Sequence, residues 1–290
     1  MIKACIFDLG GTIIDRYSLT PLIAFRKVFK KYGIDLCPQL IRKDMGLNKM
    51  DHINKIFESE DIQKQWFSRN LETIDDRVKR DIFKEFSIIQ KNETIERMKV
   101  IPQTKKCIRY LQDNDILTGV TTGFDYEQTM RVKSLLETYN IYLDSYVSST
   151  CLEKPGRPDP YMIHKNMDNL DIDDPKRIIK IDDTISGIKE GLNAGCITVA
   201  VARWSVNMGI DTYEDMTRLD NIIIDGSTNY SLNYHMQREN LKKCKEILKK
   251  SGAHYVIDTL EELPGIIEHI NRMDEPNPYK LVNLKTLKRD

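Results

Sequence analysis

The chain alternates between short apolar runs rich in β-branched residues and longer stretches in which apolar residues recur three and four positions apart. The apolar runs predict strands at residues 3–7, 116–121, 145–148, 177–181, 197–201 and 254–257. The helical stretches that follow most of them complete the pattern of an α/β protein. Strands that read as apolar runs, and not as an alternation of apolar and polar residues, favour a parallel sheet that helices cover on both faces.

The strand pattern is interrupted between about residues 15 and 99. The periodicity there predicts only helices, over residues 21–32, 37–45, 49–57, 61–71 and 75–89. An all-helical insertion directly after the first strand indicates a cap domain above the carboxyl ends of the strands. We therefore expect a Rossmann-like core domain formed by residues 1–16 and 99–272, a helical cap domain of residues 17–98, and a C-terminal tail of residues 273–290.

Two further segments have a less distinct pattern. Residues 203–233 are polar and we assign them no element, whereas residues 236–250 predict a helix with lysines on its outer face. The tail begins with an Asp-Glu-Pro-Asn-Pro sequence and continues with a basic run. Such a tail is typical of a frayed end or of an arm that contacts a partner.

Composition narrows the class of protein. Of the 290 residues, 40% are hydrophobic, and 44 lysines and arginines balance 44 aspartates and glutamates. A formal net charge of zero argues against binding to nucleic acid or to an anionic membrane, since both require clustered positive charge. No apolar run approaches the ~20 residues of a membrane-spanning helix. The six cysteines are scattered and form no CxxC pair, so we expect reduced thiols in a cytoplasmic enzyme or interaction protein.

Candidate chemistry lies at the ends of the predicted strands, where parallel sheets bind ligands. Asp8 ends the first strand and is followed by Gly10 and Gly11. Because glycine has no side chain, the backbone at these positions can approach an anion or a metal ion closely. Taken alone, this Asp-x-Gly-Gly-Thr sequence is equally well explained as a structural turn.

Three other segments favour a site over a turn. Thr122 and Gly123 follow the second strand and offer a hydroxyl and a free N–H. Asp182 and Asp183 follow a later strand and offer carboxylates. Between these two segments, a proline-rich turn presents the cation Arg157.

This order of an aspartate, a threonine, a cation and a pair of acids resembles the four motifs of the haloacid dehalogenase superfamily, and the sequence of residues 187–195 is also typical of it. The resemblance implies that Asp8 attacks phosphorus as a nucleophile. It implies a Mg²⁺ ion held by Asp8, Asp183 and the carbonyl oxygen of Gly10. It also implies contacts with the phosphoryl oxygens from the following residues: Gly11, Thr12, Thr122, Gly123 and Arg157.

Gly10 departs from the pattern of most phosphatases in this superfamily. They carry a second aspartate at this position, two residues after the nucleophile, and it protonates the leaving oxygen. Glycine has no side chain that donates a proton. Either the chain is an impaired phosphatase, or its leaving group needs no protonation on oxygen.

Residues 45–52, Met-Gly-Leu-Asn-Lys-Met-Asp-His, resemble the cap motif of the phosphonoacetaldehyde hydrolase (phosphonatase) family, in which the lysine forms a Schiff base with the substrate. The resemblance continues through residues 252–263 and spans about residues 3–272. It implies that Lys49 forms an imine with the aldehyde, and the imine accepts the electrons of the breaking carbon–phosphorus bond. A second aspartate is then unnecessary, so Gly10 and Lys49 indicate the same chemistry.

Lys49 must be partly neutral in order to attack an aldehyde, whereas a free lysine has a pKa of about 10.4. Burial under a closed cap and the charge of a nearby metal ion are expected to lower that pKa. His52 lies three positions along the predicted helix, shares a face with Lys49, and is expected to move protons during imine formation. Met45 is expected one turn before Lys49 on the same helical face and in the same pocket.

Four other positions depart from the family. Asp182 stands where the family often has glycine, and Gly187 replaces an aspartate that supports the metal ligands. Phe124 replaces a tyrosine, and Ser18 replaces a cysteine. The nucleophile and the imine-forming lysine are unchanged.

Three functions are compatible with these residues. The first is hydrolysis of the carbon–phosphorus bond of phosphonoacetaldehyde to acetaldehyde and phosphate. The second is a Mg²⁺-dependent phosphomonoesterase or phosphotransferase that acts on a small metabolite through Asp8, against which Gly10 argues. The third is an inactive phosphate- or aldehyde-binding protein, against which the retention of all the site residues argues. The resemblance to the first family also implies a homodimer joined through the cap helices.

Overall fold

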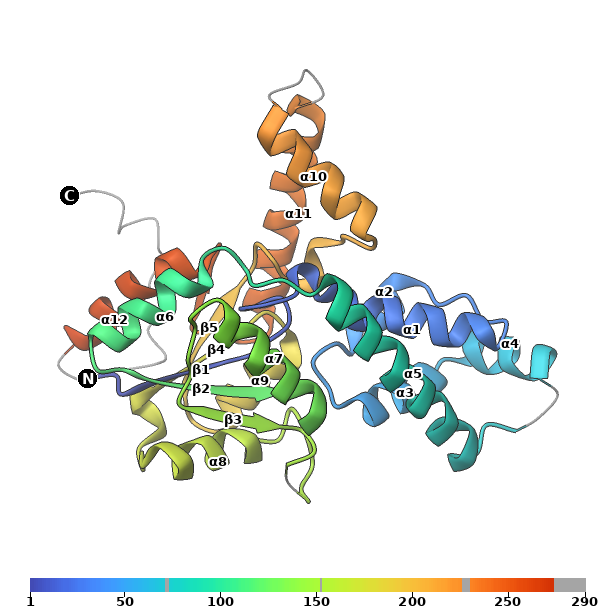
Figure 1. Cartoon of the computed structure of the whole chain (residues 1–290), viewed down its shortest axis with the longest axis horizontal. Coiled ribbons are helices and arrows are strands. Elements are labelled where there is room, and N and C mark those ends of the chain that lie inside the picture. The colour runs from blue at the N-terminus through green and yellow to red at the C-terminus, as the bar shows by residue number, and fades with distance from the viewer. Residues whose placement is uncertain (71–72, 152, 226–229, 274–290) are drawn as a thin grey trace.

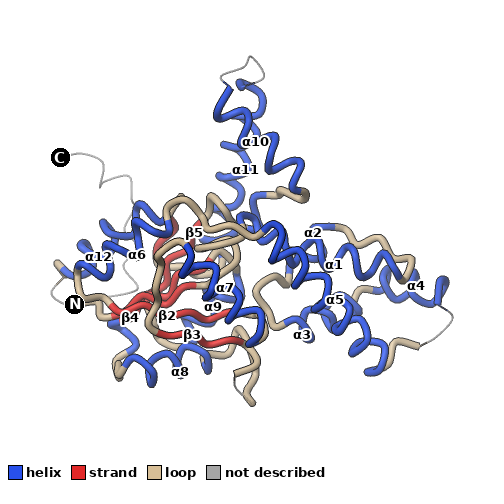
Figure 2. Tube along the Cα trace, in the orientation of Figure 1, coloured by secondary structure: helices blue, strands red, loops and turns tan. Residues whose placement is uncertain are grey.

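The computed structural model describes residues 1–70, 73–151, 153–225 and 230–273. Among these residues, six parallel strands form a central sheet in the order β3-β2-β1-β4-β5-β6 (Figures 1 and 2). The strands are β1 (Ala4–Phe7), β2 (Leu117–Thr122), β3 (Ser145–Ser148), β4 (Ile178–Asp182), β5 (Ile197–Val201) and β6 (Tyr255–Ile257). The six predicted strands are confirmed with ends that differ by one residue at most, and so is the expected α/β fold with a parallel sheet.

Helices cover both faces of the sheet, because successive residues of each strand point to opposite sides. In β1, Cys5 and Phe7 pack into one helical layer, whereas Ala4 and Ile6 pack into the other. The first layer contains α6 (Thr104–Asp113), α7 (Tyr126–Thr138) and α12 (Leu263–Asn271), and the second contains α8 (Tyr161–Leu170), α9 (Ile185–Asn193) and α11 (Tyr230–Lys250). The short 3-10 helices are η1 (Arg16–Ser18), η2 (Pro175–Arg177), η3 (Val206–Met208) and η4 (Leu260–Glu262).

A separate group of helices lies beyond one end of the sheet (Figure 1). It consists of α1 (Leu19–Lys31), α2 (Pro38–Lys43), α3 (Lys49–Phe57), α4 (Glu60–Asn70) and α5 (Asp76–Arg97). These helices pack around a hydrophobic core of their own, in which the largest buried side chains are Phe25, Phe29, Trp66 and Phe86. We call this group the cap.

Two cap helices differ in length from the predicted ones. The last two turns of α5, beyond residue 89, are polar in sequence and were not predicted as helix. They are nevertheless held against α1, where buried Glu93 forms an ion pair with Lys27. In contrast, α2 ends at Lys43 instead of residue 45, because Gly46 adopts a φ of +94° and the chain turns there.

Two hydrogen-bonded linkers join the cap to the sheet. The backbone N–H of Asp15 donates to the carbonyl of Lys99 at 2.9 Å, and the N–H of Ile101 donates to the carbonyl of Ile13, also at 2.9 Å. Asp15, Tyr17 and Ser18 all have positive φ angles between 49° and 65°, a conformation that costs energy for residues other than glycine. The chain therefore turns sharply where it enters the cap.

The polar segment at residues 203–233 contains η3, α10 (Tyr213–Asp225) and the beginning of α11, with residues 226–229 outside the described part. Helices α10 and α11 project together from the body of the molecule (Figure 1). Of the predicted tail, the described part includes only Met273. In the described part of the chain, no helix is long and apolar enough to span a membrane.

Candidate active site

Three buried carboxylates meet at the carboxyl ends of β1 and β4. Asp8 directly follows β1, Asp182 is the last residue of β4, and Asp183 comes next. Each offers an oxygen atom that lies within 4.8 Å of the oxygen atoms offered by the other two. Since β1 and β4 are neighbours in the sheet, parallel pairing alone brings these residues together.

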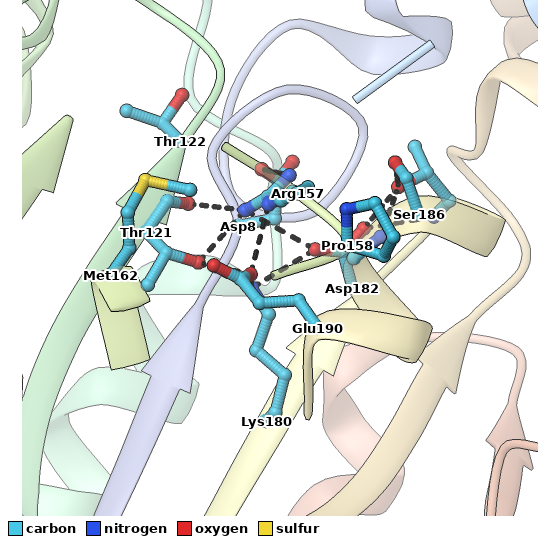
Figure 3. A network of polar contacts seen from close by, with 12 residues as sticks. Asp8, Thr121, Thr122, Arg157, Pro158, Met162, Lys180, Asp182, Ser186 and Glu190 are labelled. Carbon is cyan, nitrogen blue, oxygen red and sulfur yellow. Dashed lines mark hydrogen bonds and ion pairs between the residues drawn. The ribbon is translucent and has the colours of Figure 1, made fainter. Parts of the chain in front are cut away.

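The guanidinium of Arg157 lies beside Asp8 and is almost completely buried (Figure 3). Its Nη1 donates to Asp8 Oδ1 at 2.8 Å, its Nε donates to Glu190 Oε2 at 2.9 Å, and its Nη2 donates to the carbonyl of Thr121 at 2.6 Å. Burial alone would lower the pKa of Arg157, but Glu190, Asp182 and Asp8 raise it. Arg157 is therefore a fixed cation, aimed at the proposed nucleophile.

Lys180 and Glu190 complete this network, although the sequence analysis did not single them out. Both are fully buried, and the Nζ of Lys180 lies 2.9 Å from Asp182 Oδ2 and 3.5 Å from Glu190 Oε2. It also donates to Thr121 Oγ1 at 2.8 Å. A signal was present in the sequence: a lysine interrupts the apolar run of β4, and a charge inside a buried strand needs a partner.

The buried charge cluster contains four carboxylates and two cations: Asp8, Asp182, Asp183, Glu190, Arg157 and Lys180. Its formal excess of two negative charges disfavours the ionised forms of Asp183 and Asp8. Burial, together with Asp8 and Asp182, raises the pKa of Asp183 well above its ordinary value. Burial and Asp182 also raise the pKa of Asp8 to about 6, although Arg157 opposes that shift. A divalent cation with oxygen ligands would balance this excess, so the residues present fit such an ion.

Asp183 is held in place from two directions. The backbone N–H of Val206, in η3, donates to Asp183 Oδ2 at 3.0 Å, and the hydroxyl of Ser205 donates to the Asp183 carbonyl at 2.8 Å. On the other side, the hydroxyl of Thr12 lies 3.5 Å from Asp183 Oδ1. The segment to which we assigned no element therefore supports a principal carboxylate of the site.

Gly11 and Thr12 lie next to the Asp183 carboxylate, and their contact with a phosphoryl group stays a prediction. Gly11 has a φ of +75°, and a Cβ atom there would lie 2.5 Å from Asp183 Oδ2. Its N–H already donates to the carbonyls of Ile14 and Asp15. Thr12 is fully buried. The structure thus places both residues in support of the Asp183 carboxylate, and neither lines the cavity described below.

A loop of the cap, residues 44–48, docks directly on the core. The hydroxyl of Ser186 donates to the carbonyl of Met45 at 3.1 Å. A Cβ atom at Gly46 would lie 2.4 Å from Ser186 Oγ, and one at Gly123 would lie 2.6 Å from the carbonyl oxygen of Leu47. The contact therefore requires glycine on both of its sides, and it holds the cap closed over the strand ends.

The closed cap leaves a narrow inner cavity of about 20 Å³ beneath this loop. The residues that line it are Asp8, Gly10, Ser18, Pro21, Met45, Gly46, Lys49, Thr122, Gly123, Phe124 and Thr184. The volume suffices for about one water molecule, so a larger molecule requires the cap to move. A second, outer cavity of about 370 Å³ shares Lys49 and Gly123 with the first and extends toward Phe83 and Phe86 of α5.

Lys49 is the first residue of α3, and it is brought by the cap to the cavity that Asp8 lines from the core. Only 7% of the residue is exposed. Burial lowers the pKa of Lys49 to about 8, against the opposing effect of Asp8. Its Nζ lies 5.8 Å from the centroid of the Phe124 ring. Burial between the cap and the core therefore leaves this lysine partly neutral near neutral pH, although Asp8 favours its charged form.

His52 lies on α3 with Lys49, as expected, whereas Met45 does not; proton transfer by His52 stays a prediction. His52 is fully buried in the cap, where its ring lies 4.3 Å from the ring of Phe25 and neither nitrogen makes a hydrogen bond of ordinary geometry to a described residue. Burial and nearby Lys49 lower its pKa well below the usual value, so the imidazole is neutral. Met45 lines the inner cavity as expected, but it precedes α3, so the prediction that it shares a helical face with Lys49 is wrong.

Comparison with known proteins places this arrangement in context. A sequence model described as "Haloacid dehalogenase-like hydrolase" matches residues 5–201. The chain is 32% identical over 278 residues to a phosphonoacetaldehyde hydrolase of Bacillus cereus (strain G9842), a match that covers 94% of this chain and 98% of that protein. It is 33% identical over 280 residues to a phosphonoacetaldehyde hydrolase of Parabacteroides distasonis, with the same coverage. The crystal structure of a phosphonoacetaldehyde hydrolase like protein from Oleispira antarctica superposes with a TM-score of 0.83 at 29% identity and covers 93% of each chain.

Proposed function

The chain belongs to the phosphonoacetaldehyde hydrolase family of the haloacid dehalogenase-like hydrolases, and we propose that it hydrolyses the carbon–phosphorus bond of phosphonoacetaldehyde to acetaldehyde and phosphate. The observation that carries this proposal is the placement of Lys49. A buried lysine with a pKa lowered to about 8 lines the same cavity as Asp8. An amine from the cap and a carboxylate from the core that line one cavity suit a substrate with an aldehyde at one end and a phosphonate at the other.

The reaction begins on the cap side. The neutral amine of Lys49 attacks the aldehyde carbon, and loss of water gives an imine that is then protonated. The carboxylate of Asp8 attacks phosphorus, the carbon–phosphorus bond breaks, and its electron pair moves to carbon to give an enamine on Lys49. Protonation of the enamine and addition of water release acetaldehyde and restore the amine. A further water molecule hydrolyses the aspartyl phosphate and releases phosphate.

The core side stabilises the charge on the phosphoryl group. Arg157 donates to Asp8 and lies where its guanidinium can also bind an oxygen of a phosphoryl group attached to Asp8. Thr122 and Gly123 line the same cavity. We propose that Asp8, Asp183 and the Gly10 carbonyl hold Mg²⁺, which when bound supplies positive charge next to the phosphoryl oxygens.

The lining of the inner cavity favours carbon–phosphorus cleavage over phosphomonoester hydrolysis. Among the described residues that line it, Asp8 is the only carboxylic acid. Position 10 carries no side chain, and a Cβ atom there would lie 3.3 Å from Ser18 Oγ. An alkoxide leaving group would find no carboxylic acid to protonate it, whereas an enamine needs no proton on oxygen.

A phosphate-release assay tests the proposal directly. Phosphonoacetaldehyde is compared with a panel of phosphomonoesters at equal concentration, with wild-type protein and Lys49→Arg. We expect release from phosphonoacetaldehyde to exceed release from every ester by at least about 10²-fold and to depend on Lys49. Faster release from an ester, unchanged in Lys49→Arg, would favour the phosphomonoesterase alternative.

We also propose that two copies associate through the cap. Phe67 on α4 and Ile88 on α5 are large apolar side chains on the outside of the cap, and each is more than 60% exposed. We propose that these side chains become buried between the two copies. Family membership supports the same arrangement.

A further inference from the structure

Asp182 and Gly187 compete for one volume at the start of α9. A Cβ atom built on Gly187 would lie 1.8 Å from Asp182 Oδ2 and 2.1 Å from Asp182 Cγ. No pair of non-bonded heavy atoms tolerates such distances. The carboxylate of Asp182 therefore occupies the space in which any side chain at position 187 would begin.

The two oxygens of this carboxylate are engaged with the core of the site (Figure 3). Oδ1 accepts hydrogen bonds from the N–H and the hydroxyl of Thr184, at 2.9 Å and 2.7 Å. Oδ2 lies 2.9 Å from the Nζ of Lys180 and 3.4 Å from the Nη2 of Arg157. Asp182 thus contacts both cations of the buried charge cluster.

The geometry makes the two positions complementary: the carboxylate at 182 requires that residue 187 has no side chain. The resemblance described in the sequence analysis implies the reverse arrangement in the family, with glycine at the first position and aspartate at the second. A side chain on residue 187 would enter the volume that the Asp182 carboxylate fills. We propose that this chain has exchanged the two residues: the carboxylate reaches the same volume from β4 instead of from α9, and Asp182 is the positioning residue for Arg157 and Lys180.

The exchange explains why neither departure needs to impair the site. A glycine at 187 without Asp182 would leave Lys180 and Arg157 short of one carboxylate. An aspartate at 187 beside Asp182 would overlap with it and add a like charge. The inference rests on the phosphoryl-binding role proposed for Arg157, and unfolding and phosphate binding test it without any use of Lys49 chemistry.

The most discriminating test is whether an alanine substitution raises or lowers the melting temperature. Alanine is a better helix former than glycine, so Gly→Ala in an unobstructed helix raises the melting temperature. Gly265 in α12 is the matched control, because nothing lies within 4 Å of a Cβ atom built there. We expect Gly265→Ala to raise the melting temperature by a few °C and Gly187→Ala to lower it. In an Asp182→Gly background, Gly187→Ala should instead raise it.

A second experiment uses the double variant in which the two residues change places, Asp182→Gly with Gly187→Asp. We expect each single variant to change the dissociation constant for inorganic phosphate, measured by calorimetry with saturating Mg²⁺, at least fivefold. The double variant should return it to within twofold of the wild-type value and restore the melting temperature.

If the effects of the two substitutions add, if the double variant fails to fold, or if Gly187→Ala lowers the melting temperature equally in both backgrounds, the proposal is wrong. Should wild-type protein bind phosphate but fail to release it from phosphonoacetaldehyde, the proposed function fails while the exchange still stands.

Discussion

The Nζ of Lys49, on the cap, faces the ring of Phe124, on the core, at 5.8 Å from the ring centroid. Burial of Lys49 disfavours its charged form, whereas the face of an aromatic ring favours a cation. The ring therefore sets part of the pKa of the lysine that the proposed reaction uses.

Replacement of Phe124 by leucine should lower the pKa of Lys49 further. A desolvated cation–π contact contributes about 1–2 kcal/mol, which corresponds to a pKa shift of about 0.7–1.5 units. The rise of kcat/KM with pH, which follows the neutral amine, should then occur at lower pH. Phe124→Tyr keeps the ring face and serves as the control, with an expected shift of less than about 0.3 unit. Equal shifts in both variants would argue against the ring contact as the cause.

Borohydride should trap Lys49 during turnover. The imine between Lys49 and phosphonoacetaldehyde is reduced to a secondary amine, so activity is lost and mass spectrometry of a digest finds the adduct on the peptide that contains Lys49. Lys49→Arg should be inactive and untrapped, since a guanidinium stays protonated. Lys55→Ala is the matched control, because Lys55 lies on the same helix with an exposed side chain. An adduct on another lysine would contradict the assignment.

Lys49→Met should abolish turnover and stabilise the fold. Burial depresses the pKa of Lys49 from 10.5 to about 8, so at pH 7 the lysine is protonated in both the folded and the unfolded state. The folded protein loses stability as the pH falls from about 10.5 to about 8, because only the unfolded chain binds the proton in that window. The loss is about 3 kcal/mol, and methionine removes it. Urea unfolding at pH 7 measures the change; an unaltered or lower free energy of unfolding would show that Lys49 is not destabilising.

Activity should require a divalent cation, and the protein should bind that cation more weakly at acidic pH. Chelation abolishes turnover, added Mg²⁺ restores it, and Asp8→Ala is inactive even at saturating Mg²⁺ because the nucleophile is missing. The raised pKa of Asp183 means that protons compete with the metal, so the dissociation constant for Mg²⁺ rises as the pH falls. Calorimetry at pH 8 and pH 6 measures that trend. Full activity after chelation would exclude the proposed metal role. Asp113→Ala is the control, because Asp113 is an exposed acid on α6 and its loss should leave Mg²⁺ binding unchanged.

The linkers between cap and core should open and close during turnover. A cavity of about 20 Å³ does not admit the substrate, so the pairing of Asp15 with Lys99 and of Ile13 with Ile101 lies where the chain must bend. Hydrogen exchange at residues 13–18 and 99–102 should be faster than in β1, and inorganic phosphate with Mg²⁺ should slow it. Identical exchange with and without these ligands would remove the support for cap movement.

The sequence predicted where the candidate site residues lie, because in a parallel sheet such residues directly follow the strands. Asp8, Thr122 and Asp183 each follow an apolar run, and parallel pairing brings such residues to one edge of a sheet. Lys180 and Glu190 were not predicted, because the hydrophobic pattern leads us to expect only apolar residues on a buried strand or helix face. Their opposite charges form an ion pair between β4 and α9, which a linear pattern does not contain.

Other features depend on packing that no linear pattern contains. The polar end of α5 is helical because Glu93 pairs with Lys27 of another helix. The position of His52 against Phe25 follows from how the cap helices close around it. Asp182 and Gly187 were both visible as departures, but their competition for one volume depends on the angle between β4 and α9.

The place of β1 in the sheet has a consequence for the order in which the molecule forms during synthesis. Both neighbours of β1 lie far along the chain: Ala4 is in register with Leu117 of β2 and with Ile178 of β4. The ribosome completes the cap, which ends with Arg97, before either neighbour exists. The cap has a hydrophobic core of its own, so it can fold first, while the strand that carries the nucleophile waits unpaired.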